Sequence, residues 1–341
     1  MADIYDTSVL VGVIRNLLGT PQFLLDRYFP TEQTETSEEI HFDQEDFRRR
    51  IAPFVSPLVE GQIVASLGYK TSVFSPAYIK DKRVIDMNRP FKRNAGEAFG
   101  GDRSPMERLR AHIAREMADQ RTMIDRRLEV MAAQTLCNGQ VVIEGEKYPP
   151  VLVNFGRAVS HSVTASPLWS DPNAKVLDNL ATWGAIPLQD TGVMMQDLIM
   201  PPNIWALFRE NAQVKDRINM YRTLSEAPSL QPGTMVQGEG GTYMGTVDLW
   251  NVYVYSGWYV DPKDNIEKQI WPADKVALLS PQIQGVRCFG AIRDERAGLQ
   301  AMPYFPKSWV QEDPSVRFLM LQSAPLLVPY RINASVTAKV L

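Results

Sequence analysis

Residues Ser104–Gly139 have the sequence SPMERLRAHIAREMADQRTMIDRRLEVMAAQTLCNG, the strongest structural signal in the chain. It opens with a serine at the N-cap, a proline at the first helical position and Glu107 at the third, which together make a capping box. A stripe of mostly apolar residues follows at spacings of three and four, and Gly139 is a terminator of the C-cap type. The spacing predicts one helix over Pro105–Asn138, 34 residues or about 50 Å long.

The other faces of this predicted helix carry basic and acidic residues together, which suits solvent or neighbouring subunits. An average globular helix has about 11 or 12 residues, so this one is longer than a compact domain needs. Strict heptads are missing, which makes a coiled coil the weaker interpretation. The pattern therefore favours a long one-sided helix that lies along a flat sheet.

Further strands and helices are predicted after the long helix. Gln140–Glu144 and Pro150–Phe155 flank a turn and predict a hairpin. Strands at Arg317–Leu321 and Leu326–Leu341 are expected to pair back with this hairpin. Between these two regions, helices are predicted at Asp178–Ala185, Pro202–Asn211 and Gln213–Leu224. Strands are predicted at Val193–Ile199, Thr246–Ser256, Trp258–Asp261, Lys275–Ser280 and Val286–Ile292. With a Pro- and Gly-rich loop at Leu230–Gly245, they predict an α+β domain.

The N-terminal part of the chain is predicted to be an arm followed by strands. Residues 1–20 contain a short helical pattern, Phe23–Pro30 is apolar and aromatic, and Thr31–Glu39 is acidic. We interpret this section as an extended arm that packs on something else. Docking of the arm on the chain's own core is the alternative that the sequence leaves open. Residues 40–100 have the pattern of strands and turns.

The composition limits the possible functions. The chain has 341 residues, 36 Lys and Arg, 39 Asp and Glu, and a formal net charge of −3. A dedicated nucleic-acid binder normally has a strong basic excess, because phosphate neutralisation drives its affinity, and this chain has none. No apolar run approaches the roughly 18 residues of a membrane span, and acids stand where a signal peptide has Lys or Arg. We therefore expect a soluble protein made in a cytoplasm.

The sequence offers no motif for a catalytic, cofactor-binding or metal site. The 3 histidines and 2 cysteines lack the short spacings of zinc ligands, and no GxSxG elbow or P-loop occurs. Gly238–Gly245 resembles a phosphate loop, but it lacks the lysine and a predicted strand follows it, so a flexible loop or hairpin turn is favoured. Asp261–Asn265 lacks the spacing of a calcium loop and is predicted to be a turn. We expect neither an enzyme nor a cofactor.

An arm, protruding strands, an overlong helix and an inserted domain are typical of a subunit that contacts its neighbours. Arms and hairpins cannot bury their apolar faces alone, and docking on other subunits offsets the entropy of ordering them. Several short motifs are specific enough to compare with known families. They are Trp205–Arg209, Val254–Gly257 with Tyr259-Val260, Pro306-Lys307 with Trp309-Val310, and Gln322–Leu326, with weaker ones at Phe54–Pro57, Phe74–Pro76 with Tyr78, and Gly156-Arg157. In these motifs, and from about Tyr5 to the end, the chain resembles the lambda-type major capsid (head) proteins of tailed bacteriophages.

This resemblance implies the HK97-like capsid fold, an α+β architecture. On that template, residues 1–45 are the N-terminal arm and 46–100 are the extended loop. Residues 101–175 are the peripheral domain, with its spine helix at 105–138, and residues 176–304 are the axial domain. Residues 305–341 are C-terminal strands that complete the peripheral domain.

The resemblance also implies a function. A protein of this family self-assembles as hexamers and pentamers into an icosahedral head shell around a packaged dsDNA genome, without sequence-specific DNA binding and without a membrane. The expected partners are further copies of the chain, a portal, a scaffolding protein and a decoration protein. The scaffold is expected to be a separate protein, because no long N-terminal extension is present. The expected location is the virion, and the host cytoplasm during assembly.

Aromatic residues on the arm and the extended loop are the candidate inter-subunit contacts, because these segments have little core of their own. They are Phe23, Tyr28, Tyr69, Phe74 and Tyr78. Two other classes of protein stay open at this point. One is an encapsulin-like compartment, which shares the fold but encloses cargo protein, and the other is a soluble enzyme with a cryptic site.

Overall fold

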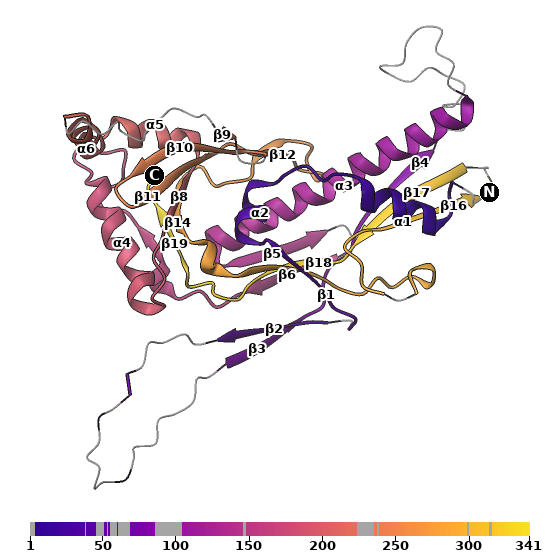
Figure 1. Cartoon of the computed structure of the whole chain (residues 1–341), viewed down its shortest axis with the longest axis horizontal. Coiled ribbons are helices and arrows are strands. Elements are labelled where there is room, and N and C mark those ends of the chain that lie inside the picture. The colour runs from indigo at the N-terminus through magenta and orange to yellow at the C-terminus, as the bar shows by residue number, and fades with distance from the viewer. Residues whose placement is uncertain are drawn as a thin grey trace.

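The structure is a computed structural model of the chain, and it describes residues 4–37, 39–45, 51–52, 54, 60, 69–85, 104–145, 148–223, 235–236, 239–298, 300–313 and 316–341. Most of the predicted extended loop 46–100 lies outside these residues, as do residues 230–234 and 237–238 of the predicted loop Leu230–Gly245. The described part is an elongated body from which one two-stranded hairpin projects (Figure 1). No helix in the described ranges is both long and apolar enough to cross a membrane.

Helix α3, Pro105–Asn138, runs through the body as its spine and confirms the predicted boundaries (Figure 1). The Ser104 hydroxyl accepts from the Glu107 N–H at 3.3 Å, and the Ser104 N–H donates to the Glu107 carboxylate at 2.8 Å. The helix ends at Gly139, which has a left-handed backbone conformation with a φ of 67°. Glycine adopts this conformation without steric cost. Residues Leu128–Cys137 are buried nearly all round the helix, so this half lies inside the molecule.

A seven-stranded sheet, here called the main sheet, forms one end of the body. Its strand order is β7 (Ser162–Thr164), β19 (Ser335–Lys339), β14 (Lys275–Leu279), β8 (Asp197–Met200), β11 (Trp250–Tyr255), β10 (Gly241–Val247) and β9 (Met235–Val236). The pairs β7–β19 and β8–β11 are parallel and the others antiparallel. Helices α4 (Val176–Asp190), α5 (Pro202–Glu210) and α6 (Ala212–Thr223) gather at the same end (Figure 1).

The remaining strands form smaller sheets. The three-stranded sheets are β1 (Thr31–Thr34) with β15 (Gly285–Phe289) and β18 (Pro325–Pro329), and β16 (Phe305–Gln311) with β17 (Val316–Ser323) and β4 (Ile79–Ile85). The two-stranded sheets are β2 (Ile40–Glu45) with β3 (Tyr69–Phe74), β5 (Gln140–Gly145) with β6 (Tyr148–Asn154), and β12 (Trp258–Val260) with β13 (Glu267–Gln269). Short 3₁₀ turns complete the described elements, at η2 (Val159–His161), η3 (Pro281–Ile283) and η4 (Glu295–Ala297). The mixture of helices and sheets confirms the α+β class.

Two predictions about the strands are wrong. The C-terminal strands do not pair with the β5–β6 hairpin, because β17 pairs with β16 and β4, β18 with β15, and β19 lies between β7 and β14. Alternating hydrophobicity identifies a strand but not its partner. The predicted loop Leu230–Gly245 is a strand from Gly241 onward, since Gly241–Val247 pairs with β11 along its length. The turn predicted at Asp261–Asn265 is confirmed, with the Asn265 N–H donating to the Asp261 carbonyl at 2.8 Å.

The N-terminal arm lies along its own chain. Helix α1 (Thr7–Asn16) contacts α3 and β16, and helix α2 (Phe23–Tyr28) contacts α3. Strand β1 pairs in parallel with β15. Apolar residues of the arm, the spine helix and the main sheet therefore share one continuous core.

Candidate assembly site

The N-terminal end of α2 rests on a buried carboxylate of the spine helix. The N–H groups of Leu24 and Leu25 donate to the two oxygens of Glu129 at 2.9 and 3.0 Å, and the Tyr255 hydroxyl donates to the same carboxylate at 3.0 Å. Glu129 is fully buried. Burial raises the pKa of Glu129 to about 7, although the three hydrogen bonds favour the carboxylate and act in the opposite direction. One side chain thus joins the arm, the spine helix and the main sheet.

The C-terminal end of α2 is joined to the main sheet by a second buried carboxylate. Arg27 donates to both oxygens of Asp197, the first residue of β8, at 2.7 Å each, and the Tyr28 hydroxyl donates to it at 2.9 Å. The Arg27 guanidinium also lies 4.8 Å from the centre of the Tyr253 ring. Burial, reinforced by the Asp197 charge, raises the pKa of Tyr28 well above its usual value, so its hydroxyl keeps the proton that it donates.

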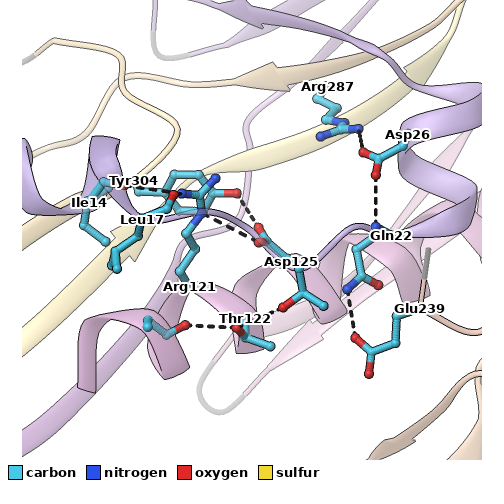
Figure 2. Close-up of polar contacts among 12 residues, drawn as sticks. Ile14, Leu17, Gln22, Asp26, Arg121, Thr122, Asp125, Glu239, Arg287 and Tyr304 are labelled. Atoms are coloured by element: carbon cyan, nitrogen blue, oxygen red, sulfur yellow. Dashed lines mark hydrogen bonds and ion pairs between the residues drawn. The ribbon is translucent and has the colours of Figure 1, made fainter. Parts of the chain in front are cut away.

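The C-terminal end of α1 is held by the spine helix through Arg121 (Figure 2). Arg121 donates to the Ile14 carbonyl at 3.3 Å and to the Leu17 carbonyl. A cation at this end complements the helix dipole. The Arg121 guanidinium also lies 5.1 Å from the centre of the Tyr304 ring, and the Tyr304 hydroxyl donates to Asp125. This cluster connects α1 and α3 to the segment just ahead of β16.

Polar contacts also fix the turn between α1 and α2. The Gln22 N–H donates to Asp26 at 3.0 Å, and the Gln22 side-chain amide donates to Glu239 at 3.1 Å (Figure 2). Arg287 on β15 donates to the other Asp26 oxygen at 2.7 Å. Together with the contacts of Glu129, Asp197 and Arg121, they form what we call the arm anchor, the set of bonds that holds residues 14–29 against α3, the main sheet and β15.

Two of the predicted inter-subunit aromatics lie inside this anchor. Phe23 and Tyr28 are 3% and 0% exposed, and the Phe23 ring centre lies 5.1 Å from that of Tyr253. A Cβ atom at Gly241 would come within 2.3 Å of Phe23, so the close packing requires glycine there. In this conformation neither aromatic side chain has exposed surface for contact with a neighbouring chain. Both residues are instead packed on the chain's own core, which is the alternative that the sequence left open.

The other predicted aromatics lie on the second strand of the projecting hairpin and just after it. Phe74 on β3 is half-buried against the main core, and the Tyr78 hydroxyl donates to the Ala291 carbonyl at 2.7 Å. Tyr69 is the first residue of β3, and its side chain lies outside the described residues. The hairpin is attached to the body by Phe42, whose ring centre lies 5.7 Å from that of Phe155. The structure therefore separates this group from Phe23 and Tyr28.

The described residues contain no group of three or more His, Cys, Asp or Glu side chains that would hold a metal. Both cysteines are buried, and burial raises the pKa of Cys137 and of Cys288 to about 12, which keeps them as thiols. The arrangement connects segments of the chain rather than presenting reactive groups to a cleft. Neither Glu129 nor Asp197 was predicted from the sequence. Asp197 could have been found, because it is the one acidic residue in the apolar strand pattern Val193–Ile199.

Comparison with known proteins gives this architecture an identity. The profile of the family described as "Phage major capsid protein E" matches residues 6–340. The major capsid protein of Escherichia phage lambda is 29% identical over 330 residues, which cover 95% of this chain and 95% of that protein. A capsid protein of a prophage of E. coli CFT073 has a crystal structure with a TM-score of 0.75 and 22% identity, covering 98% of this chain and 99% of its own.

A more distant solved structure, the capsid of Ralstonia phage GP4, has a TM-score of 0.52 at 11% identity and covers 94% of this chain and 92% of its own. These likenesses show the HK97-like capsid fold. The matched family consists of structural proteins that form phage heads, not of enzymes. Because the family profile spans the arm, the spine helix and both groups of sheets, the chain belongs to the phage major capsid protein E family.

Proposed function

We propose that copies of this chain form the hexamers and pentamers of an icosahedral head shell that encloses a dsDNA genome. The observation that carries the proposal is the projecting β2–β3 hairpin, which forms a two-stranded sheet of its own (Figure 1). An isolated two-stranded hairpin is marginally stable in water. Its outward-facing Val73 is 49% exposed. A neighbouring subunit in a shell would supply the surface that the hairpin lacks.

We keep the predicted domain organisation in this proposal but assign two strands to a different domain. Residues 1–45 act as the arm, 46–100 as the extended loop, and 101–175 with most of 305–341 as the peripheral domain. Residues 176–304 form the axial domain, which would meet its copies around the fivefold and sixfold axes. Strands β7, Ser162–Thr164, and β19, Ser335–Lys339, belong with the axial domain, because both are part of the main sheet.

The partners and the location follow from this role. The chain would assemble with a scaffolding protein and a portal, and a decoration protein would bind the outside of the finished shell. A formal net charge of −3 suits a wall that encloses DNA, because a strongly basic wall would retain the incoming strand. Assembly would take place in the host cytoplasm, and the product would be the virion. Tyr69, Phe74 and Tyr78 remain the proposed inter-subunit aromatics.

The test is to express the full chain alone and together with its neighbouring phage genes, and to analyse both samples by sedimentation and negative-stain microscopy. Closed particles of hundreds of subunits, made more uniform by a scaffold gene, are the expected result. A stable monomer or dimer under every condition would contradict the shell-forming role. Particles from infected cells should contain DNA, and particles filled with protein cargo would favour the encapsulin-like alternative.

A further inference from the structure

A buried histidine connects three elements at the end of the main sheet. His161 is the last residue of η2 and is 0% exposed. Its Nδ1 atom lies 2.9 Å from the backbone carbonyl oxygen of Ser335, the first residue of β19. Its Nε2 atom lies 2.9 Å from a carboxylate oxygen of Asp190, the last residue of α4. We call these three residues the His161 clasp.

The partners of the two ring nitrogens define the protonation state that this geometry requires. A backbone carbonyl and an ionised carboxylate both accept hydrogen bonds, and neither has a proton to donate. A neutral imidazole carries one N–H, so it can satisfy only one of these two acceptors. Both contacts of His161 are hydrogen bonds only when both ring nitrogens carry a proton. The arrangement therefore fits an imidazolium.

The position of Asp190 favours this charge. Asp190 ends α4, where the helix dipole is negative and a cation is stabilised. Its side chain is 48% exposed, so an ionised carboxylate remains solvated there and can also face the ring. When the ring is neutral, the buried Ser335 carbonyl still needs a donor, while Asp190 can turn to water. The bond to Asp190 is then the one that is lost.

The other charged side chains on the surrounding elements have partners of their own. Arg157, ahead of η2, donates to the Ser162 hydroxyl at 3.2 Å, and Arg331, ahead of β19, donates to the Thr191 carbonyl at 3.3 Å. Lys339, on β19, pairs with Asp274 at 3.6 Å, and β7 has no charged residue. The carboxylate that directly faces the ring is that of Asp190, so the imidazolium depends on this one partner.

We propose that the His161 clasp is a proton-operated connection between α4 and the main sheet. The imidazolium ties the C-terminal end of α4 to β19, and loss of one proton releases Asp190 and loosens that end of the helix. The connection is closed while the ring carries both protons and open once it carries one. The inference concerns the subunit itself and holds whether or not the chain forms a shell.

The Asp190→Asn variant separates proton control from mere packing. An asparagine amide can donate to a neutral Nε2, so this variant keeps both contacts of the ring without the second proton. The readout is hydrogen exchange at the N–H groups of Thr191 and Gly192, which donate to carbonyls in the last turn of α4 at 2.8 and 3.1 Å. After correction for intrinsic rates, we expect about tenfold or more faster exchange at pH 8 than at pH 5.5 in the wild type. We expect no such change in Asp190→Asn.

The protonation state is measured directly by nitrogen-15 NMR of the full-length chain with labelled histidine. The chain has only 3 histidines, and His161→Gln assigns the relevant signal while His41 and His112 serve as internal references. Spectra are taken from pH 5.5 to pH 8, and we expect both His161 nitrogens to be protonated where the end of α4 is protected from exchange and only one where exchange is fast. A singly protonated ring throughout this range, or equal pH dependence in wild type and Asp190→Asn, would overturn the proposal.

Discussion

Arg27 in the arm and Asp197 at the start of β8 are joined by two parallel hydrogen bonds of 2.7 Å each. The Asp197 side chain is fully buried and that of Arg27 is 25% exposed. Water therefore competes little for the carboxylate, and the planar guanidinium satisfies both of its oxygens at once. This pair makes the arm a part of the folded subunit rather than an appendage.

Replacement of Arg27 is expected to destabilise the subunit strongly, because Asp197 would remain buried without its cation. We expect Arg27→Ala to lower the free energy of unfolding by about 3 kcal/mol or more. Urea denaturation of the unassembled subunit measures this loss in the free energy of unfolding. The matched control is Arg217→Ala, which removes a more exposed ion pair with Asp248 at 2.8 Å and should cost about 1 kcal/mol or less. Equal losses in the two variants would show that burial of the Arg27 pair contributes nothing.

Glu129 is expected to make the stability of the subunit depend on pH. Its pKa is raised from 4.5 to about 7 in the folded chain, so between these values the folded state holds a proton that the unfolded chain has lost. The contribution of this group to stability therefore falls as the pH rises through that window. Glu129→Gln cannot ionise, and we expect a flatter dependence of the urea midpoint on pH. A slope identical to that of wild type would contradict this assignment.

Gly139→Ala is expected to destabilise the end of the spine helix. The residue has a φ of +67°, and a Cβ atom there would lie 2.7 Å from the Cβ of Arg157. The left-handed backbone costs a non-glycine residue about 1–2 kcal/mol, and the crowding adds to it, so we expect a loss of about 2 kcal/mol or more. Gly12→Ala is the control, because nothing lies within 4 Å of its added Cβ inside α1. That variant should be neutral or slightly stabilising when its unfolding is measured in the same way.

The hairpin variant Val73→Glu tests the proposed subunit contact. Val73 is 49% exposed on the projecting β2–β3 hairpin, and Val142 is 47% exposed on the β5–β6 hairpin beside the spine helix. We expect Val73→Glu subunits to unfold like wild type but to give far fewer closed particles by sedimentation, because a charge would have to be buried against the neighbour. Val142→Glu controls for the added charge. Normal particle yield from Val73→Glu would remove this face of the hairpin from the proposed contact.

The parts of the fold that depend on neighbours in sequence could be predicted. The capping residues before Pro105 and the glycine after Asn138 set both ends of the spine helix. The helices α4, α5 and α6 and the β5–β6 hairpin were also predicted, with shifts of a few residues at their ends. Caps, turns and periodicity act within one or two turns of chain, so a sequence displays them directly.

The contacts that build the arm anchor could not be predicted, because they join residues far apart in the chain. Glu129 meets Leu24 across 105 positions and Arg27 meets Asp197 across 170. Nothing in the arm pattern distinguishes its own core from a neighbouring subunit as the surface on which the aromatics dock. The partners of β19 in the main sheet could not be predicted either, because they also lie far from it in the chain. Its burial on both faces fits an inner strand, but its neighbours are fixed by the whole topology.

The parallel pairing of β1 with β15 also has a consequence for the order in which the subunit is completed during synthesis. Thr31 and Val286 face each other in this pair, so the ribosome must add about 250 residues after β1 before its partner strand exists. At about 5–20 residues per second, this interval lasts roughly 13–50 s. During that time the strand has no partner within its own chain. A paired β1 therefore marks a chain that has been translated past β15, and it distinguishes such chains from shorter nascent ones.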